Sequence, residues 1–296
     1  MSRILRFLRP CVQHAKSCTA TIPATQRVLP ATQAFSRLFS DGAGLVKVDK
    51  EEGYAVMHLN SPPVNSLNTP MLQAITETIQ DLEDDNRMQG LILTSACPKI
   101  FSAGLDITEM YQKSSESTDR FWRSLQDMWL TLYGTRLATV AAVNGHSPAG
   151  GCLMATSCDY RIMADGAYTI GLNEVHLGIV APFWFKDIML STVGQRETER
   201  ALGLGLLYKP QEALDIGLID EISPEDEILD RAKEQLLKWT KIPGFARMTT
   251  KRLIRDANMQ KLSEVREDDI NMFTNFIQMD ATQKHLGRYL ASLKKK

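Results

Sequence analysis

The sequence predicts an α/β fold for most of the chain, followed by a helical C-terminal region. Apolar strand-like segments alternate with helix-like segments from residue 45 to residue 172, an order typical of a sheet covered by helices. One of these segments, residues 90–95 (GLILTS), has no charged residue, as expected of a strand that is buried on both faces. From about residue 186 onward, helical patterns dominate.

The elements of the core can be assigned in order along the chain. Residues 45–49 and 54–60 are expected to form paired strands, because the turn at 51–53 (EEG) separates them and the proline pair at 62–63 ends the second. A helix follows, since Thr69 can cap it, Pro70 suits its first turn, and apolar residues then recur at helical spacing. The remaining core elements are expected to be a strand at 90–95, a helix at 121–133, a strand at 139–143, a short helix at 152–157, and strands at 158–163 and 168–172.

The C-terminal part is expected to consist of helices that cap the core or serve assembly. The expected helices are 196–204, 210–216, 224–240, 245–257 and a long final one at 263–293. We therefore divide the chain into a leader at residues 1–40, a core at 41–235 and a C-terminal helical region at 236–296.

The first forty residues have the composition of a mitochondrial transit peptide. They contain six basic residues, several serines and no acidic residue. Residues 37–40 (RLFS) resemble the sequence at which the matrix processing peptidase cuts, so we expect the mature chain to start near Ser40 and to reside in the mitochondrial matrix. The alternative is a disordered basic arm that binds nucleic acid or lipid.

Charge, cysteine spacing and hydropathy exclude several classes of protein. The whole chain has a net charge of −1, and removing the six positive charges of the leader leaves −7, which disfavours a broad nucleic-acid-binding face. The cysteines after the leader lack C-x-x-C spacing, so we expect neither a disulfide framework nor a metal site. Residues 137–158 are uncharged, but polar residues, proline and glycine interrupt them. We interpret them as strand, turn and buried helix, and expect no transmembrane segment.

The first candidate functional segment is residues 101–106 (FSAGLD), shortly after the strand at 90–95. Gly104 allows an unusual turn or a close approach by a ligand. Asp106 and Glu109 have the spacing of a capping box, so a helix is expected to begin there. An ordinary strand-to-helix turn would have the same pattern.

The second candidate segment is residues 144–152 (NGHSPAGGC), which resembles the G-x-S-x-G turn of serine hydrolases. That turn uses the backbone N–H of the residue after the serine, but the residue after Ser147 is Pro148, which has none. The pair Gly150 and Gly151 instead offers bare N–H groups at the start of a helix, where developing negative charge is stabilised. The alternative is close packing of the helix against a neighbour.

The third candidate segment is residues 170–179, where Glu174 stands among apolar residues after an expected strand. A desolvated carboxylate there would have a raised pKa and could accept a proton near neutral pH. The alternative is a solvated loop glutamate. His176 has no carboxylate partner at short range, so we expect it to be a packing or surface residue.

Together these segments resemble the crotonase (enoyl-CoA hydratase/isomerase) superfamily from about residue 46 to residue 222. The markers are residues 63–67 (PVNSL), 101–106 (FSAGLD), 142–145 (AVNG) with 149–152 (AGGC), 158–161 (CDYR) and 212–220 (EALDIGLID). The resemblance implies a spiral of stacked ββα units, assembled as trimers or pairs of trimers, that binds acyl-CoA thioesters. It implies no cofactor apart from the CoA carried by the substrate.

The resemblance also implies roles for particular residues. The N–H groups of Leu105 and Gly150 would form an oxyanion hole for the thioester oxygen, and Glu174 would be the catalytic base. The residues implied to bind substrate are Ala103, Gly104, Leu105, Asp106, Ile107 and Gly150.

Two departures from family patterns favour a double-bond isomerase. Hydratases of the family have a glutamate immediately after the Gly-Gly-Cys, where this chain has Leu153, and dienoyl-CoA isomerases have an aspartate where it has Pro182. The resemblance is then strongest to the Δ3,Δ2-enoyl-CoA isomerases, in which one base moves a proton from C2 to C4 for β-oxidation.

Several alternatives remain at this point. They are a hydratase or acyl-CoA hydrolase that works with Glu174 alone, a non-catalytic protein that binds CoA esters, and a serine esterase that uses Ser147. The aromatic residues 183–185 could line an acyl tunnel or pack in the core.

Overall fold

A computed structural model describes residues 44–293 of the chain. The expected leader at 1–40 and its cleavage site lie outside the described residues. In the described part, no helix is both long and apolar enough to cross a membrane.

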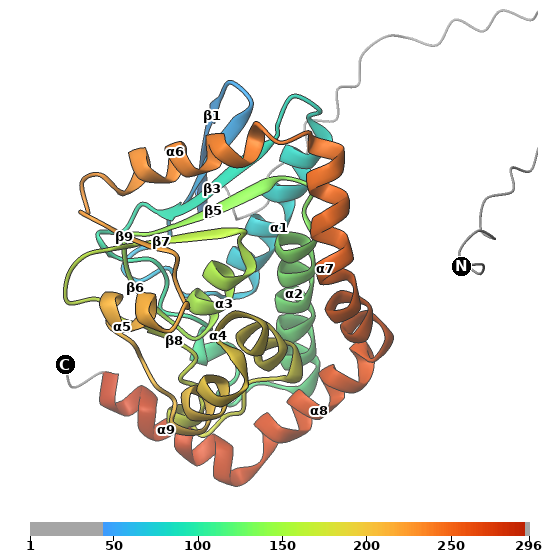
Figure 1. Ribbon diagram of the computed structural model, residues 1–296. Coiled ribbons are helices and arrows are strands. Elements are labelled where there is room, and N and C mark those ends of the chain that lie inside the picture. Colours follow the sequence, from blue (N-terminus) through green and yellow to red (C-terminus); the bar gives the residue numbers. More distant parts are fainter. Residues whose placement is uncertain (1–43, 294–296) are drawn as a thin grey trace, which may run out of the picture. The chain divides into compact units, whose positions relative to one another are not determined.

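The larger of two sheets has six strands in the order β1-β2-β3-β5-β7-β9 (Figure 1). Only the hairpin of β1 and β2 is antiparallel; the other neighbours are parallel. β3 and β5 lie in the middle and are buried along their whole length, as their uncharged, largely apolar sequences predict. The strands are β1 (Val46–Glu51), β2 (Tyr54–Leu59), β3 (Gly90–Ser95), β5 (Ala138–Val143), β7 (Tyr160–Ala164) and β9 (Glu221–Ser223).

The smaller sheet consists of three short parallel strands, β4 (Lys99–Ile100), β6 (Gly145–Pro148) and β8 (Ile170–Gly171). Each follows a strand of the larger sheet and precedes a helical segment, so the chain repeats a strand, strand, helix unit. This repetition is the ββα spiral that the family resemblance implies. Because β4, β6 and β8 are parallel neighbours, their carboxyl ends lie at the same edge of the smaller sheet. The segments that follow these three strands are therefore close together. Those segments are the three candidate functional segments.

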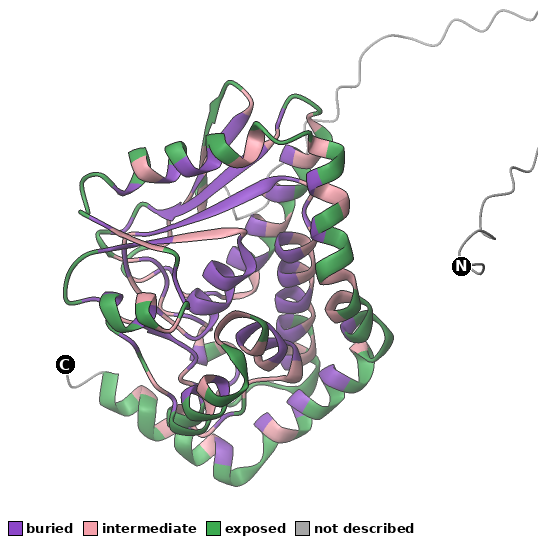
Figure 2. Ribbon diagram, viewed as in Figure 1, coloured by how far each residue is buried: buried purple, intermediate pink, exposed green. Residues whose placement is uncertain are grey.

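Helices surround the sheets in the order that the sequence predicts. α6 packs on β3, β5 and β7, while α1 to α3 lie on the other side of the larger sheet in Figure 1. Every residue of α3 is buried (Figure 2). The helices are α1 (Thr69–Asp84), α2 (Ser115–Gly134), α3 (Gly150–Ser157), α4 (Phe183–Leu204), α5 (Pro210–Asp215), α6 (Ile228–Thr240), α7 (Gly244–Glu264), α8 (Arg266–Gln278) and α9 (Asp280–Leu293).

The helix predictions differ from the structure at several points. The cap of α1 is Asn68, whose side chain accepts from the Met71 N–H at 3.0 Å, whereas Thr69, the expected cap, is the first helical residue.

The helix expected at 196–204 is only the second part of α4, because α4 begins at Phe183 and is interrupted at Gly194 (φ 79, ψ 170). The long helix expected at 263–293 begins within the end of α7 and continues as α8 and α9, which are separate because the chain is extended at Met279 (φ −62, ψ 135). The helix expected after Asp106 is a single 3-10 turn, η1 (Ile107–Glu109). Asp106 does cap this turn, since its carboxylate accepts from the Thr108 N–H at 2.8 Å. The expected capping box does not form, because the Glu109 carboxylate accepts from the N–H of Thr69 at 3.0 Å.

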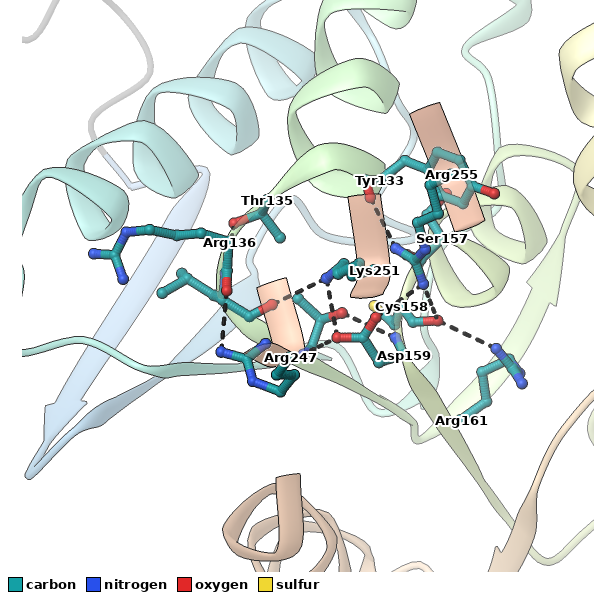
Figure 3. Close-up of polar contacts among 12 residues, drawn as sticks. Tyr133, Thr135, Arg136, Ser157, Cys158, Asp159, Arg161, Arg247, Lys251 and Arg255 are labelled. Atoms are coloured by element: carbon teal, nitrogen blue, oxygen red, sulfur yellow. Dashed lines mark hydrogen bonds and ion pairs between the residues drawn. The ribbon is translucent and has the colours of Figure 1, made fainter. Parts of the chain in front are cut away.

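A stripe of three basic residues, Arg247, Lys251 and Arg255, joins α7 to the core (Figure 3). Lys251 and Arg255 each lie 2.9 Å from the buried carboxylate of Asp159. Arg255 also donates to the carbonyl oxygen of Ser157, the last residue of α3, at 2.9 Å. Cations at the C-terminal end of a helix stabilise it, so this stripe holds α3 from the end opposite Gly150.

Candidate active site

A cavity of about 60 Å³ lies where the segments after β4, β6 and β8 meet. All three candidate segments contribute to its wall, and α9 adds one residue from far along the chain. The lining residues are Ala103, Leu105, Ile107, Met110, Pro148, Ala149, Asn173, Glu174, Leu177, Ile179 and Tyr289. Glu174 is the single acidic residue among them, and apolar side chains form most of the wall.

Glu174 is the first residue of the 3-10 turn η2 (Glu174–Leu177), directly after β8 and its two-residue extension. It is 3% exposed, and neither carboxylate oxygen has a hydrogen-bond partner between residues 44 and 293. Burial raises its pKa from 4.5 to about 7. The carboxylate can therefore both accept and release a proton near neutral pH.

The backbone on both sides of Leu105 is fixed by hydrogen bonds to Leu67. The Leu67 N–H donates to the carbonyl of Gly104 at 2.9 Å, and the Asp106 N–H donates to the carbonyl of Leu67 at 3.2 Å. The N–H of Leu105 itself donates to no group in the described range. This arrangement leaves one backbone donor free beside the cavity.

A second free donor is the N–H of Gly150, the first residue of α3. The first N–H groups of a helix have no acceptor within the helix, and α3 has no side-chain cap. Among the residues that the structure describes, no acceptor is found for this N–H. The preceding residue is fixed, because Ala149 N–H donates to the carbonyl of Gly171 at 2.8 Å.

The turns that contain Gly104 and Gly150 are in close contact. A Cβ atom on Gly104 would lie 3.1 Å from the Gly150 nitrogen and 2.9 Å from the Cβ of Ala149. A Cβ atom on Gly150 would lie 3.5 Å from the Gly104 Cα and 2.8 Å from a methyl group of Leu67. Gly104 also has a φ of +84, which favours glycine. The glycines thus allow the approach that brings the Leu105 and Gly150 segments together.

Of the residues expected to bind substrate, the cavity wall contains Ala103, Leu105 and Ile107. Gly104, Asp106 and Gly150 are next to the wall in the chain but are not part of it. The Asp106 carboxylate is occupied by the N–H and the hydroxyl of Thr108, at 2.8 and 2.7 Å.

Other candidate residues are not in the cavity. Ser147 lies within β6 and is fully buried, which does not suit a serine nucleophile. His176 is exposed and donates from Nε2 to the carbonyl of Leu204 at 2.9 Å, so it is a surface histidine as expected. Trp184 and Phe185 are fully buried and pack against each other with ring centroids 4.6 Å apart, which confirms core packing.

Several cavity residues were not identified as site residues from the sequence. Met110 lies shortly after the first candidate segment, and five others lie within the second and third candidate segments: Pro148, Ala149, Asn173, Leu177 and Ile179. Tyr289 lies on α9, and nothing in the sequence links it to Glu174. Its position depends on how α9 docks, which includes hydrogen bonds from Gln283 Nε2 to the carbonyl of Met110 at 3.1 Å.

A larger, open depression of about 600 Å³ lies at α5 and β9 and contains none of these residues. Two of its three carboxylates, Asp220 and Glu221, are paired with Arg161 and Arg231 at 2.9 and 2.6 Å, and the third, Asp165, is exposed to solvent. The small cavity, with an unpaired carboxylate and free backbone donors, is therefore the better candidate for chemistry.

Comparisons of sequence and of structure with known proteins both find enoyl-CoA hydratases and isomerases. The profile described as enoyl-CoA hydratase/isomerase matches residues 49–296. The chain is 49% identical over 262 residues to "Enoyl-CoA delta isomerase 1, mitochondrial" of Mus musculus, covering 88% of this chain and 91% of that protein. The Homo sapiens protein of the same name is 45% identical over 260 residues, with coverage of 88% and 86%. The crystal structure of human mitochondrial delta3-delta2-enoyl-CoA isomerase superposes with a TM-score of 0.84 at 45% identity, covering 85% of this chain and 98% of that one.

Proposed function

This chain belongs to the enoyl-CoA hydratase/isomerase family, and on that basis we propose that it is a Δ3,Δ2-enoyl-CoA isomerase of fatty acid β-oxidation. It would convert cis- or trans-3-enoyl-CoA to trans-2-enoyl-CoA. The names of the mouse and human relatives support this reaction. No cofactor is proposed, because the CoA group arrives as part of the substrate.

In the proposed mechanism Glu174 removes a proton from C2 of the substrate and returns one to C4. The thioester oxygen would accept hydrogen bonds from the N–H groups of Leu105 and Gly150, which hold the negative charge of the dienolate. The positive end of α3 adds to this stabilisation. Losing one donor of this kind generally costs about 3 kcal/mol of barrier.

The observation that carries the proposal is the single buried carboxylate in an apolar cavity. Moving a proton within a substrate needs one base, whereas adding water requires that a water molecule be held and activated. The position where hydratases have a second glutamate is Leu153, which is fully buried in α3. Glu174 is left as the only acid in the wall, and this favours isomerisation over hydration.

Replacing Glu174 by glutamine tests this proposal. The variant should bind acyl-CoA nearly as tightly as the wild type and should lose conversion of 3-hexenoyl-CoA to trans-2-hexenoyl-CoA, measured by chromatography. The exposed change Glu52→Gln serves as the matched control and should leave turnover unchanged. Turnover that persists in Glu174→Gln would contradict the assignment.

Product analysis separates the alternatives. Formation of 3-hydroxyacyl-CoA from trans-2-hexenoyl-CoA would indicate a hydratase, and release of free CoA thiol would indicate a hydrolase. Tight binding of CoA esters without turnover of any of them would indicate a binding protein.

We also propose that the protein assembles as a homotrimer or a pair of trimers in the mitochondrial matrix. α7 carries three exposed apolar side chains, Phe245, Leu253 and Ile254, which are 72 to 80% exposed in the single chain. Sedimentation analysis tests the assembly. Fusing residues 1–40 to a fluorescent protein, and testing its import and cleavage, tests the destination.

A further inference from the structure

The turn between β6 and α3 has an unusual backbone conformation at Ala149. Its φ of 49 and ψ of −120 place a residue other than glycine in a region that costs about 1 to 3 kcal/mol. Pro148, the last residue of β6, precedes it, and Gly150, the first residue of α3, follows it. A strained residue between a strand and a helix is the geometry of the nucleophile elbow of hydrolases.

The structure shifts the elbow by two residues from the position that the sequence pattern suggests. The G-x-S-x-G comparison puts the nucleophile at Ser147, but Ser147 lies within the strand. Its hydroxyl is buried and has no partner among the described residues. The strained position is Ala149. The next residue, Gly150, retains its N–H, and Gly151 supplies the glycine two positions after the nucleophile.

The surroundings of Ala149 match those that a nucleophile requires. Ala149 lines the same cavity as Glu174 and Leu105. Its backbone is fixed by the hydrogen bond to Gly171, and its methyl group lies against Gly104. Ala149 therefore shares its cavity with an unpaired carboxylate and with Leu105, whose N–H is free, and the next residue, Gly150, has a second free N–H. The side chain of Ala149 itself is only a methyl group.

We propose that Ala149 occupies the nucleophile position of this elbow and determines which reaction the site performs. Because a methyl group cannot attack the thioester, the base and the two N–H donors act only on the C–H protons of the substrate. The inference rests on the proposed function, since it takes an acyl-CoA thioester as the substrate.

The proposal predicts that a hydroxyl group at this position converts the site to acyl transfer. In Ala149→Ser, the Oγ would form a bond to the thioester carbonyl carbon as the C–S bond breaks. Glu174 would take the hydroxyl proton and pass it to the departing thiolate, which leaves as CoA thiol. Water would then hydrolyse the ester, releasing the carboxylic acid and restoring the serine.

The experiment uses butyryl-CoA, which has no double bond and so is not a substrate for isomerisation. Purified Ala149→Ser should gain one butyryl group, detected by intact-protein mass spectrometry and located by peptide mapping, and should release CoA thiol. Adding Glu174→Gln to this variant should lower thiol release by about 100-fold or more, as expected for loss of a general base. Ala149→Cys provides a second nucleophile if the serine variant fails to fold.

Matched controls separate the elbow from a general effect of new hydroxyl groups. Ala155→Ser places the same hydroxyl on α3 outside the cavity wall and should not become acylated. Ser147→Ala should leave isomerisation unchanged.

The two proposals fail in different ways. Absence of acylation in the folded serine and cysteine variants overturns the elbow assignment, whatever the isomerase assay shows. A wild type without isomerase activity, combined with an acylated Ala149→Ser, overturns the proposed function and supports the elbow.

Discussion

Replacing Glu174 by glutamine should stabilise the folded protein even though the proposed activity is lost. The residue is 3% exposed, and no group from residue 44 to residue 293 donates a hydrogen bond to its carboxylate, so its charge is uncompensated. Burial raises its pKa from 4.5 to about 7. Each pKa unit corresponds to about 1.4 kcal/mol, so the ionised carboxylate should lower the free energy of unfolding by about 3 kcal/mol.

The effect depends on pH with a definite sign. Below pH 4.5 the carboxyl group is protonated in both the folded and the unfolded chain, and it contributes little to the difference. Between pH 4.5 and about 7 the unfolded chain has released a proton that the folded chain still holds, so stability falls as the pH rises. Above about pH 7 the full penalty is present.

Urea denaturation of the wild type and of Glu174→Gln, at pH 8 and at pH 5, measures this penalty. The variant should be more stable by about 3 kcal/mol at pH 8 and by less than about 1 kcal/mol at pH 5. Glu52→Gln, in the exposed turn between β1 and β2, should show no such dependence. A gain that is equal at both pH values, or absent at pH 8, would refute the reasoning from burial.

Three further predictions follow from the same structure. The kcat/KM for isomerisation should rise about tenfold per pH unit up to about pH 7 and then level off, because Glu174 must be ionised; initial rates from pH 5 to pH 9 test this. Gly104→Ala should lower kcat by about 100-fold or more, since its Cβ would lie 2.9 Å from that of Ala149. In contrast, Gly53→Ala should lower only stability, because Gly53 has a φ of +82 but an added Cβ atom would have no other atom within 4 Å. Steady-state kinetics and thermal unfolding of both variants test the difference. Arg255→Met should lower the free energy of unfolding by about 1.5 to 3 kcal/mol, because it removes one of the two cations that lie against the buried Asp159 while Lys251 remains. Arg247→Met should lower the free energy of unfolding by less, since Arg247 donates only to backbone carbonyls within the described chain. Denaturant titrations compare the two variants, and equal losses of stability would contradict the role given to Asp159.

Five of the six strands of the larger sheet could be predicted because their signals are local, whereas β9, with three residues, was not predicted. β3 and β5 have uncharged, largely apolar sequences, and such runs indicate a buried strand without knowledge of the strands that pair with it. Glu174 was assigned as the base through the family resemblance, because the apolar run around it left a solvated loop glutamate as an equally open interpretation. The structure places it as expected, buried in a cavity.

The remaining features depend on tertiary contacts that the sequence does not display. β4 and β6 have two and four residues, too few for a period to be recognised. The Glu109 carboxylate accepts a hydrogen bond from the N–H of Thr69, forty residues earlier in the chain. The prediction of a local capping box between Asp106 and Glu109 was therefore wrong. The break between α8 and α9 at Met279 has neither glycine nor proline to mark it.

The two-sheet spiral also determines where the chain tolerates changes of length. Three links, from β3 to β4, from β5 to β6 and from β7 to β8, determine where each of the three candidate functional segments lies relative to the cavity. One inserted residue between β5 and β6 would therefore displace the start of α3 without altering any side chain that touches the substrate. An insertion away from these links, such as in the turn between β1 and β2, would leave the three candidate segments in place. We therefore expect a one-residue insertion between β5 and β6 to lower activity, and the same insertion between β1 and β2 to leave activity unchanged.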